Sequence, residues 1–217
     1  MKKHTVASII ILIIIFTYAI IRYHILRGVP WDNFPLYISN KAISLASLVF
    51  IAISYMLGSL AKFIPNVFVK ALPSRKFFGL LGFGLAAVHA LISAIIFSPA
   101  YYGRFFAENG KLNLNGELIL AFGILAFFTF LIVAITSLPS IAEKLDNKEW
   151  LAMQRLGYLG LIFLLLHVFI LGRRGWLIPD AWRAGMMPIS LVAAIVITFT
   201  LVLKITAILI PKKPNAS

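Results

Sequence analysis

Two histidines lie far inside apolar runs of this sequence, where an imidazole is a costly side chain to place. His89 lies in RKFFGLLGFGLAAVHALISAIIF, residues 75–97, and His167 lies in LAMQRLGYLGLIFLLLHVFILG, residues 151–172. An ionisable group inside a membrane is expensive unless a partner compensates for its lost hydration, so each is a candidate functional residue. Either one alone could instead be a neutral imidazole bonded to a neighbouring helix, a contact that contributes ~0.6 kcal/mol on average.

The two histidines have similar depths. His89 follows Arg75 by 14 residues and His167 follows Trp150 by 17 residues, and both segments enter from the same side. At about 1.5 Å per helical residue, these separations are ~21 Å and ~25 Å. Two imidazoles at one depth favour a shared role over two unrelated structural contacts.

Small residues accompany both histidines. Gly82 and Gly160 each precede their histidine by seven residues, which is two turns along the same helical face. Two readings are open: the glycines let helices pack closely, or they leave room for a flat macrocycle between two helices. Two imidazoles with no carboxylate or thiolate nearby suit the axial positions of a b-type haem better than a zinc site. We therefore predict that His89 and His167 bind the iron of a haem, with Gly82 and Gly160 beside it.

The elements that must position these residues are membrane-spanning helices. Of the 217 residues, 61% are hydrophobic and 12% are charged, whereas about 25% of a soluble domain is charged. Six apolar segments have about 20 residues each, the length that a ~30 Å hydrocarbon layer requires. They are residues 5–23, 42–64, 76–97, 118–138, 150–171 and 188–210. The sequence predicts an all-α, polytopic six-helix transmembrane bundle that forms one domain over residues 1–217.

Composition excludes several kinds of site and weakens one class of protein. The chain has no cysteine, which rules out disulfides, thiolate metal sites, iron–sulfur clusters and covalently attached haem. The seven acidic residues all lie in loops or at segment ends, whereas ion-coupled transporters usually need a carboxylate within the membrane. A transporter or channel with structural histidines and a haem-free scaffold subunit are the alternatives to a cytochrome.

The formal net charge of +13 comes from basic residues that border the apolar segments. Such residues are a topology signal and attract anionic lipid, so we expect no nucleic-acid partner. Twelve of the 20 Lys and Arg residues lie on one side, which predicts that both termini are cytoplasmic. Because only short tails flank the segments, we expect no NAD- or FAD-binding domain and an electron donor supplied by a partner.

The stretches around the histidines carry motifs of a known pattern. SRKFFGLLGFGLAAVH, residues 74–89, has the basic pair Arg75 and Lys76 ahead of His89. ITSLPSIAEKLDNKEWLAMQRLGYLGLIFLLLH, residues 135–167, continues the pattern at Thr136, Ser137, Trp150, Tyr158 and His167. Over residues 40–171 the chain resembles the ferric reductase-like transmembrane domain family, and within it the haem-binding membrane subunit of the bacterial periplasmic methionine sulfoxide reductase system.

The resemblance implies a membrane cytochrome b, an electron-transfer subunit of an oxidoreductase system in the bacterial inner membrane. Related oxidases and ferric reductases hold a second, inner haem at the level where this sequence has Arg75 and Gln154. Neither side chain is an iron ligand, which implies one haem b in the outer leaflet.

The resemblance also implies partners. Electrons would come from a cytoplasmic flavin reductase or from quinol, with FMN or a quinone bridging the gap, and pass to a periplasmic oxidoreductase or ferric iron. Arg104, Arg173 and Arg174, near the outer rim, would either pair with haem propionates or anchor lipid headgroups. His24, just past the first segment, is either a third candidate ligand or an interfacial histidine.

Overall fold

The computed structural model describes residues 3–178 and 182–210, and its regular elements in those ranges are helical. Six helices are long and apolar enough to cross a membrane: His4–Ile25, Trp31–Phe63, Ser74–Ile96, Leu114–Ile135, Asn147–Trp176 and Arg183–Leu209. The prediction of an all-α, six-helix transmembrane bundle is confirmed. Lys2, Lys212 and Lys213, part of the charge count for orientation, lie outside the described residues.

The long helices are α1, Lys3–Ala19; α2, Ser39–Phe63; α4, Ser74–Ile96; α6, Leu114–Ile135; α8, Asn147–Trp176; and α9, Ile189–Leu209. Short α-helical turns are α3, Pro65–Phe68; α5, Pro99–Tyr102; and α7, Pro139–Ala142. Short 3₁₀ turns are η2, Trp31–Asn33; η4, Val69–Ala71; η5, Gly103–Phe105; and η7, Arg183–Gly185. Two segments are π-helical, η1 at Ile20–Ile25 and η3 at Phe34–Ile38.

Polar caps move the helix ends away from the predicted bounds. α8 begins at Asn147 because Asp146 and Glu149 form a capping box, in which the Asp146 carboxylate accepts from the backbone N–H groups of Lys148 and Glu149. α6 begins at Leu114, four residues before the predicted segment, because the Asn113 side chain accepts from Gly116 N at 3.1 Å. The apolar pattern marks only the part of each helix that lipid must cover. The capped turns add residues to the helix beyond that part.

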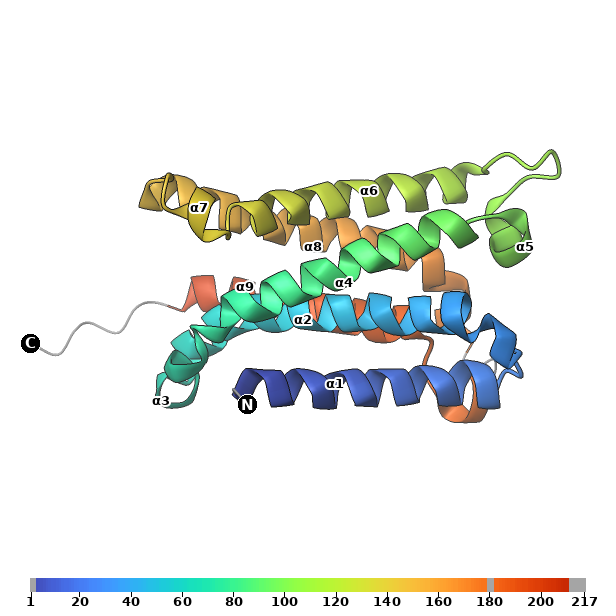
Figure 1. Ribbon diagram of the computed structural model, residues 1–217, viewed down its shortest axis with the longest axis horizontal. Helices are drawn as coiled ribbons and strands as arrows, with labels where there is room; N and C mark the ends of the chain where they lie inside the picture. Colours follow the sequence, from blue (N-terminus) through green and yellow to red (C-terminus); the bar gives the residue numbers. More distant parts are fainter. Residues whose placement is uncertain (1–2, 179–181, 211–217) are drawn as a thin grey trace, which may run out of the picture.

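The helices form an elongated bundle with two recognisable ends (Figure 1). α5 lies at one end, where α4 ends and α2, α6 and α9 begin, and we call this the α5 end. α3 and α7 lie at the other, which we call the α7 end. α2 packs mainly against α4, α6 packs mainly against α8, and α9 contacts both α2 and α8.

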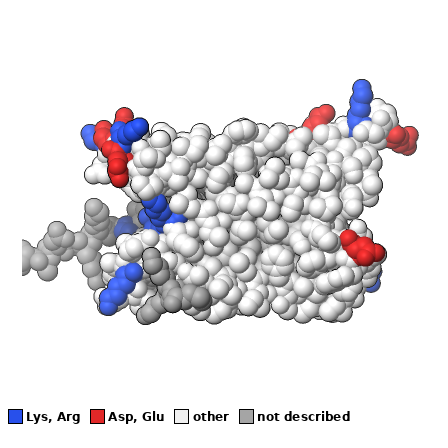
Figure 2. All heavy atoms as spheres, viewed as in Figure 1, with Lys and Arg blue, Asp and Glu red and all other residues white. Residues whose placement is uncertain are grey.

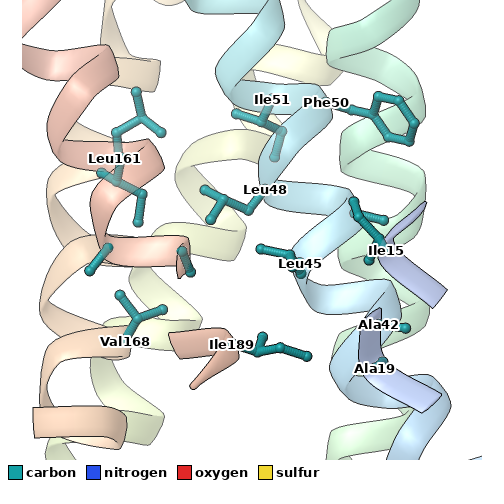
Figure 3. Packing of buried hydrophobic residues seen from close by; sticks show 14 of the residues in the cluster. Ile15, Ala19, Ala42, Leu45, Leu48, Phe50, Ile51, Leu161, Val168 and Ile189 are labelled. Atoms are coloured by element: carbon teal, nitrogen blue, oxygen red, sulfur yellow. The ribbon is translucent and has the colours of Figure 1, made fainter. Parts of the chain in front are cut away.

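The core is apolar and centred on α2. Leu45 and Leu48 of α2 belong to the same buried cluster as Leu161 and Val168 of α8, and all four side chains are labelled in Figure 3. Large apolar side chains on the outside, such as Leu91, stay exposed, as expected where lipid is the solvent. On the face drawn in Figure 2, charged side chains gather at the two ends and leave an uncharged band between them.

Candidate functional site

His89 lies on α4, seven residues before the helix ends, and is tied to the start of α2. Its Nδ1 lies 2.7 Å from Oδ1 of Asn40, the second residue of α2. An amide oxygen only accepts hydrogen bonds, so Nδ1 carries the proton and donates. The lone pair of the neutral ring is therefore on Nε2.

His167 lies on α8 and has an equivalent contact to α6. Its Nδ1 lies 2.8 Å from the carbonyl oxygen of Ile119, which can only accept. Gly123 of α6 makes room for the ring, since Nδ1 lies 3.1 Å from the position that a Cβ of this residue would take. Nδ1 donates here too, and the free lone pair is again on Nε2.

The two Nε2 atoms are the part of the site that could bind a metal. Within residues 3–178 and 182–210, neither atom has a hydrogen-bond partner and neither is fully enclosed. Metal-binding histidines almost always donate their other ring N–H to an oxygen, as both do here. In the same ranges, no group of three or more His, Cys, Asp or Glu side chains could hold a metal ion. Two imidazole nitrogens are what a macrocycle that supplies the remaining ligands requires of a protein.

The two predicted glycines are sites of close helix packing. A Cβ at Gly82 would lie 2.7 Å from the Ile51 side chain and 2.9 Å from the Ser47 carbonyl oxygen, both on α2. A Cβ at Gly160 would lie 3.0 Å from the ring of Phe130 on α6. Both positions therefore support the first of the two readings, close approach of helices. A haem contact at either glycine stays a prediction.

The predicted arginines gather at the α5 end, where α8 ends and α6 begins. Arg104, Arg173 and Arg174 line a small cavity of about 10 Å³. Arg104 donates to the Leu171 carbonyl oxygen, and Arg173 Nη2 lies 3.4 Å from Asn115 Oδ1. Partial burial, together with the positive charges of Arg174 and Arg27, lowers the pKa of Arg104. Their pairing with haem propionates stays a prediction.

A lysine beside Asn40 escaped the sequence analysis. The Lys41 ammonium lies 4.3 Å from the ring centroid of Tyr37, 5.2 Å from that of Tyr23 and 5.6 Å from that of Tyr102. Tyr23 and Tyr37 lie in the π-helical segments, and such segments often occur at functional sites. The sequence feature that could have identified Lys41 is a lysine in the first turn of an apolar helix.

At the α7 end, a larger cavity lies between α2, α4, α6 and α8. Its volume is about 360 Å³, and Arg75 and Gln154 both line it, although 79 positions separate them in the sequence. Arg75 Nε donates to the Ser54 carbonyl oxygen at 3.0 Å, and Gln154 Nε2 donates to Ser137 Oγ at 3.1 Å. Other lining residues include Ile51, Tyr55, Lys76, Phe83, Phe130 and Trp150. The lining of the cavity thus combines polar groups with aromatic side chains.

His24 lies in η1, and its side chain makes local contacts. Its Nδ1 is 2.8 Å from the carbonyl oxygen of Val29, and its ring packs edge-on against Trp31. Both partners belong to the segment between α1 and α2, which agrees with the interfacial reading.

Comparison with known proteins gives a consistent family. Residues 42–165 match the family described as "Ferric reductase like transmembrane component". The chain is 26% identical to metalloreductase STEAP2 of Mus musculus over 203 residues, which cover 82% of this chain and 41% of that protein. It is 27% identical to human (Homo sapiens) metalloreductase STEAP2 over 164 residues, or 64% of this chain and 34% of the relative. It is also 28% identical to metalloreductase STEAP3 of Rattus norvegicus over 166 residues, which cover 64% of this chain and 34% of that protein. The chain thus matches less than half of the length of each relative.

Proposed function

Because the chain belongs to the ferric reductase like transmembrane component family, we propose that it carries electrons across a membrane through one haem b held by His89 and His167. Bound between the two rings, a haem supplies a one-electron Fe(III)/Fe(II) couple. The family makes the chain a membrane electron-transfer component of an oxidoreductase. The haem, its ligands and both electron partners are the proposal.

The observation that carries this proposal is the matched hydrogen bonding of the two imidazoles. Nδ1 of each ring donates to an oxygen on a neighbouring helix, and each Nε2 keeps its lone pair and some open surface. An imidazole that served only to pack helices would have no need to keep one nitrogen unpaired. Both rings lie in the half of the bundle nearest the α5 end, as two axial ligands of one haem require.

The cavity at the α7 end supports one haem and a second, organic redox group. Arg75 and Gln154, which the resemblance puts at the level of an inner haem in related reductases, both line this cavity, and neither side chain is an iron ligand. The cavity of about 360 Å³ admits a flat ring such as the flavin of FMN or a quinone head. Arg75 and Lys76 at its wall favour FMN, because a phosphate gains charge-assisted hydrogen bonds that a neutral quinone does not.

The spacing along α4 makes this cavity a reasonable entry point for electrons. Phe83 lines the cavity and precedes His89 by six residues, or ~9 Å along the helix. With the α7 end on the cytoplasmic side of a bacterial inner membrane, the donor is a cytoplasmic flavin reductase or membrane quinol. This orientation follows from the distribution of Lys and Arg residues and puts both termini in the cytoplasm.

The basic residues at the α5 end favour an anionic electron acceptor. Arg104, Arg174 and Lys41 gather near Tyr37 and Tyr102. Ferric iron in water is carried by anionic chelators, and the printed names of the relatives describe metalloreductases. We therefore place ferric chelates first as acceptors and a periplasmic oxidoreductase second.

Absorption spectroscopy of the purified chain tests the haem. A dithionite-reduced cytochrome b has a sharp α-band, which we expect at a haem-to-protein ratio near one. His89→Ala and His167→Ala should each abolish the band, and His24→Ala, the matched control, should keep it. Absence of haem after expression with added haem would favour a transporter or a scaffold with structural histidines, and a ratio near two would contradict the single haem.

A further inference from the structure

Asn40 is a buried polar residue whose amide is bonded at both ends to a neighbouring helix. It is the second residue of α2 and only 2% exposed. Its Oδ1 accepts from His89 Nδ1 at 2.7 Å, and its Nδ2 donates to Ser93 Oγ at 3.0 Å. Burial of an amide in an apolar bundle is costly unless both ends are bonded, and asparagine is not a favourable helix residue. The chain nevertheless has asparagine at the α2 position that contacts His89.

Ser93 bonds the other end of the amide. It lies one helical turn after His89 on α4, and its hydroxyl oxygen accepts from the NH₂ end of Asn40 in the observed orientation. If the amide turned over, it would donate toward His89 Nδ1, and the ring proton would move to Nε2. A histidine protonated on Nε2 cannot bind a metal through that atom. A hydroxyl can bond the amide in either orientation, and the observed orientation is the one that leaves His89 competent as a ligand.

The two candidate ligands are held by different oxygens. His167 is held by a backbone carbonyl, which no substitution of Ile119 removes. His89 is held by a side chain, so its acceptor can be varied by mutation. The acceptor behind a ligating histidine sets the basicity of the ring, and this basicity is one means by which a protein tunes the potential of iron.

We propose that Asn40 is a positioning residue that holds His89 in its Nδ1–H tautomer and, through its neutral amide, sets the reduction potential of the site. This inference rests on the proposed function, since it requires iron at Nε2. The amide leaves the imidazole neutral. A carboxylate in its place would draw the Nδ1 proton, make the ring a stronger donor to iron and favour the oxidised state.

The test compares full-length variants purified in detergent and loaded with haem. Asn40→Asp should shift the oxidised-to-reduced ratio at a given potential at least tenfold toward oxidised, a fall of ~59 mV for one electron. Asn40→Leu should lower haem occupancy at limiting haem, because His89 loses the acceptor that fixes its tautomer. Ser47→Ala is the matched control: it removes another α2–α4 hydrogen bond, to the Gly82 carbonyl oxygen two helical turns before His89, and should keep wild-type occupancy and potential.

The outcomes separate this inference from the proposed function. If wild-type protein binds haem and His89→Ala loses it, but Asn40→Asp keeps the wild-type potential, the positioning role of Asn40 is overturned and the cytochrome stands. Should Asn40→Asp not fold, full haem occupancy in Asn40→Leu would overturn the role equally. If wild-type protein binds no haem, the proposed function itself fails.

Discussion

The ring of His167 lies against Gly123, with Nδ1 of the imidazole 3.1 Å from the position of an added Cβ. A methyl group there requires the ring to move by a few tenths of an ångström away from the Ile119 carbonyl oxygen. This contact links the packing of α6 on α8 to the orientation of a candidate iron ligand.

We predict that Gly123→Ala lowers haem occupancy and alters the low-spin spectrum of the oxidised protein, because the His167 ring leaves its position. Gly84→Ala on α4 is the control, since a Cβ at Gly84 meets nothing within 4 Å. The control should keep its haem and gain roughly 0.5–1 kcal/mol of stability from the lower backbone entropy of the unfolded chain. Equal haem spectra for both variants would contradict this role for Gly123.

A second prediction concerns Gly157, which lies under the Tyr55 hydroxyl group. A Cβ at position 157 would overlap that hydroxyl, and Tyr55 donates from it to the Gln154 carbonyl oxygen at 3.2 Å. Gly157→Ala should therefore destabilise the bundle by about 1–3 kcal/mol through overpacking. Unfolding in detergent measures this loss. Adding Tyr55→Phe should restore part of it, and a fully stable Gly157→Ala variant would show that Tyr55 moves freely.

The cavity at the α7 end provides a third prediction. If Arg75 holds a phosphate, Arg75→Gln should weaken FMN binding by roughly 10- to 100-fold, as expected when a charge-assisted hydrogen bond is lost. Riboflavin, which has no phosphate, should bind wild-type and variant alike. Fluorescence titration of both flavins measures the difference. Tight binding of a quinone and of neither flavin would identify quinol as the donor.

A fourth prediction follows from Tyr102, outside the membrane-spanning helices. Burial, together with neighbouring Tyr37 and Tyr23, raises the pKa of Tyr102 from 10.0 to about 12. The unfolded chain loses the Tyr102 proton near pH 10, whereas the folded chain keeps it. The contribution of Tyr102 to the free energy of unfolding is therefore constant below pH 10 and falls as pH approaches 12. Tyr102→Phe should remove on the order of 1–2 kcal/mol of that fall. Thermal unfolding at pH 8–11.5 gives both slopes, and identical slopes would contradict the prediction.

Electron delivery to an anionic chelate provides a fifth prediction. Reduction of ferric citrate should slow as ionic strength rises, since salt screens the attraction between the chelate and the cluster of Arg104, Arg174 and Lys41. Arg104→Gln should slow the reaction at low salt and reduce its salt dependence. A rate that does not respond to salt would favour a protein acceptor held by apolar contacts.

The sequence by itself determined the class of fold and the pair of histidines. Lipid requires runs of about 20 apolar residues whose backbone groups bond within the helix. The six spans can therefore be identified without knowing how the helices pack against one another. The cost of an ionisable group in lipid singles out His89 and His167 in the same way. Helix ends were less predictable because polar caps such as Asp146 extend helices beyond their apolar part.

Only the tertiary structure decided what surrounds these histidines. Asn40 meets His89 across 49 positions, and Arg75 meets Gln154 at one cavity, because α2, α4, α6 and α8 pack side by side. Gly82 and Gly160 have the same spacing from their histidines, yet a neighbouring helix fills the space beside each glycine. Helical periodicity specifies which residues share one face of a helix. Which other helix packs against that face depends on the tertiary arrangement, which no local pattern encodes.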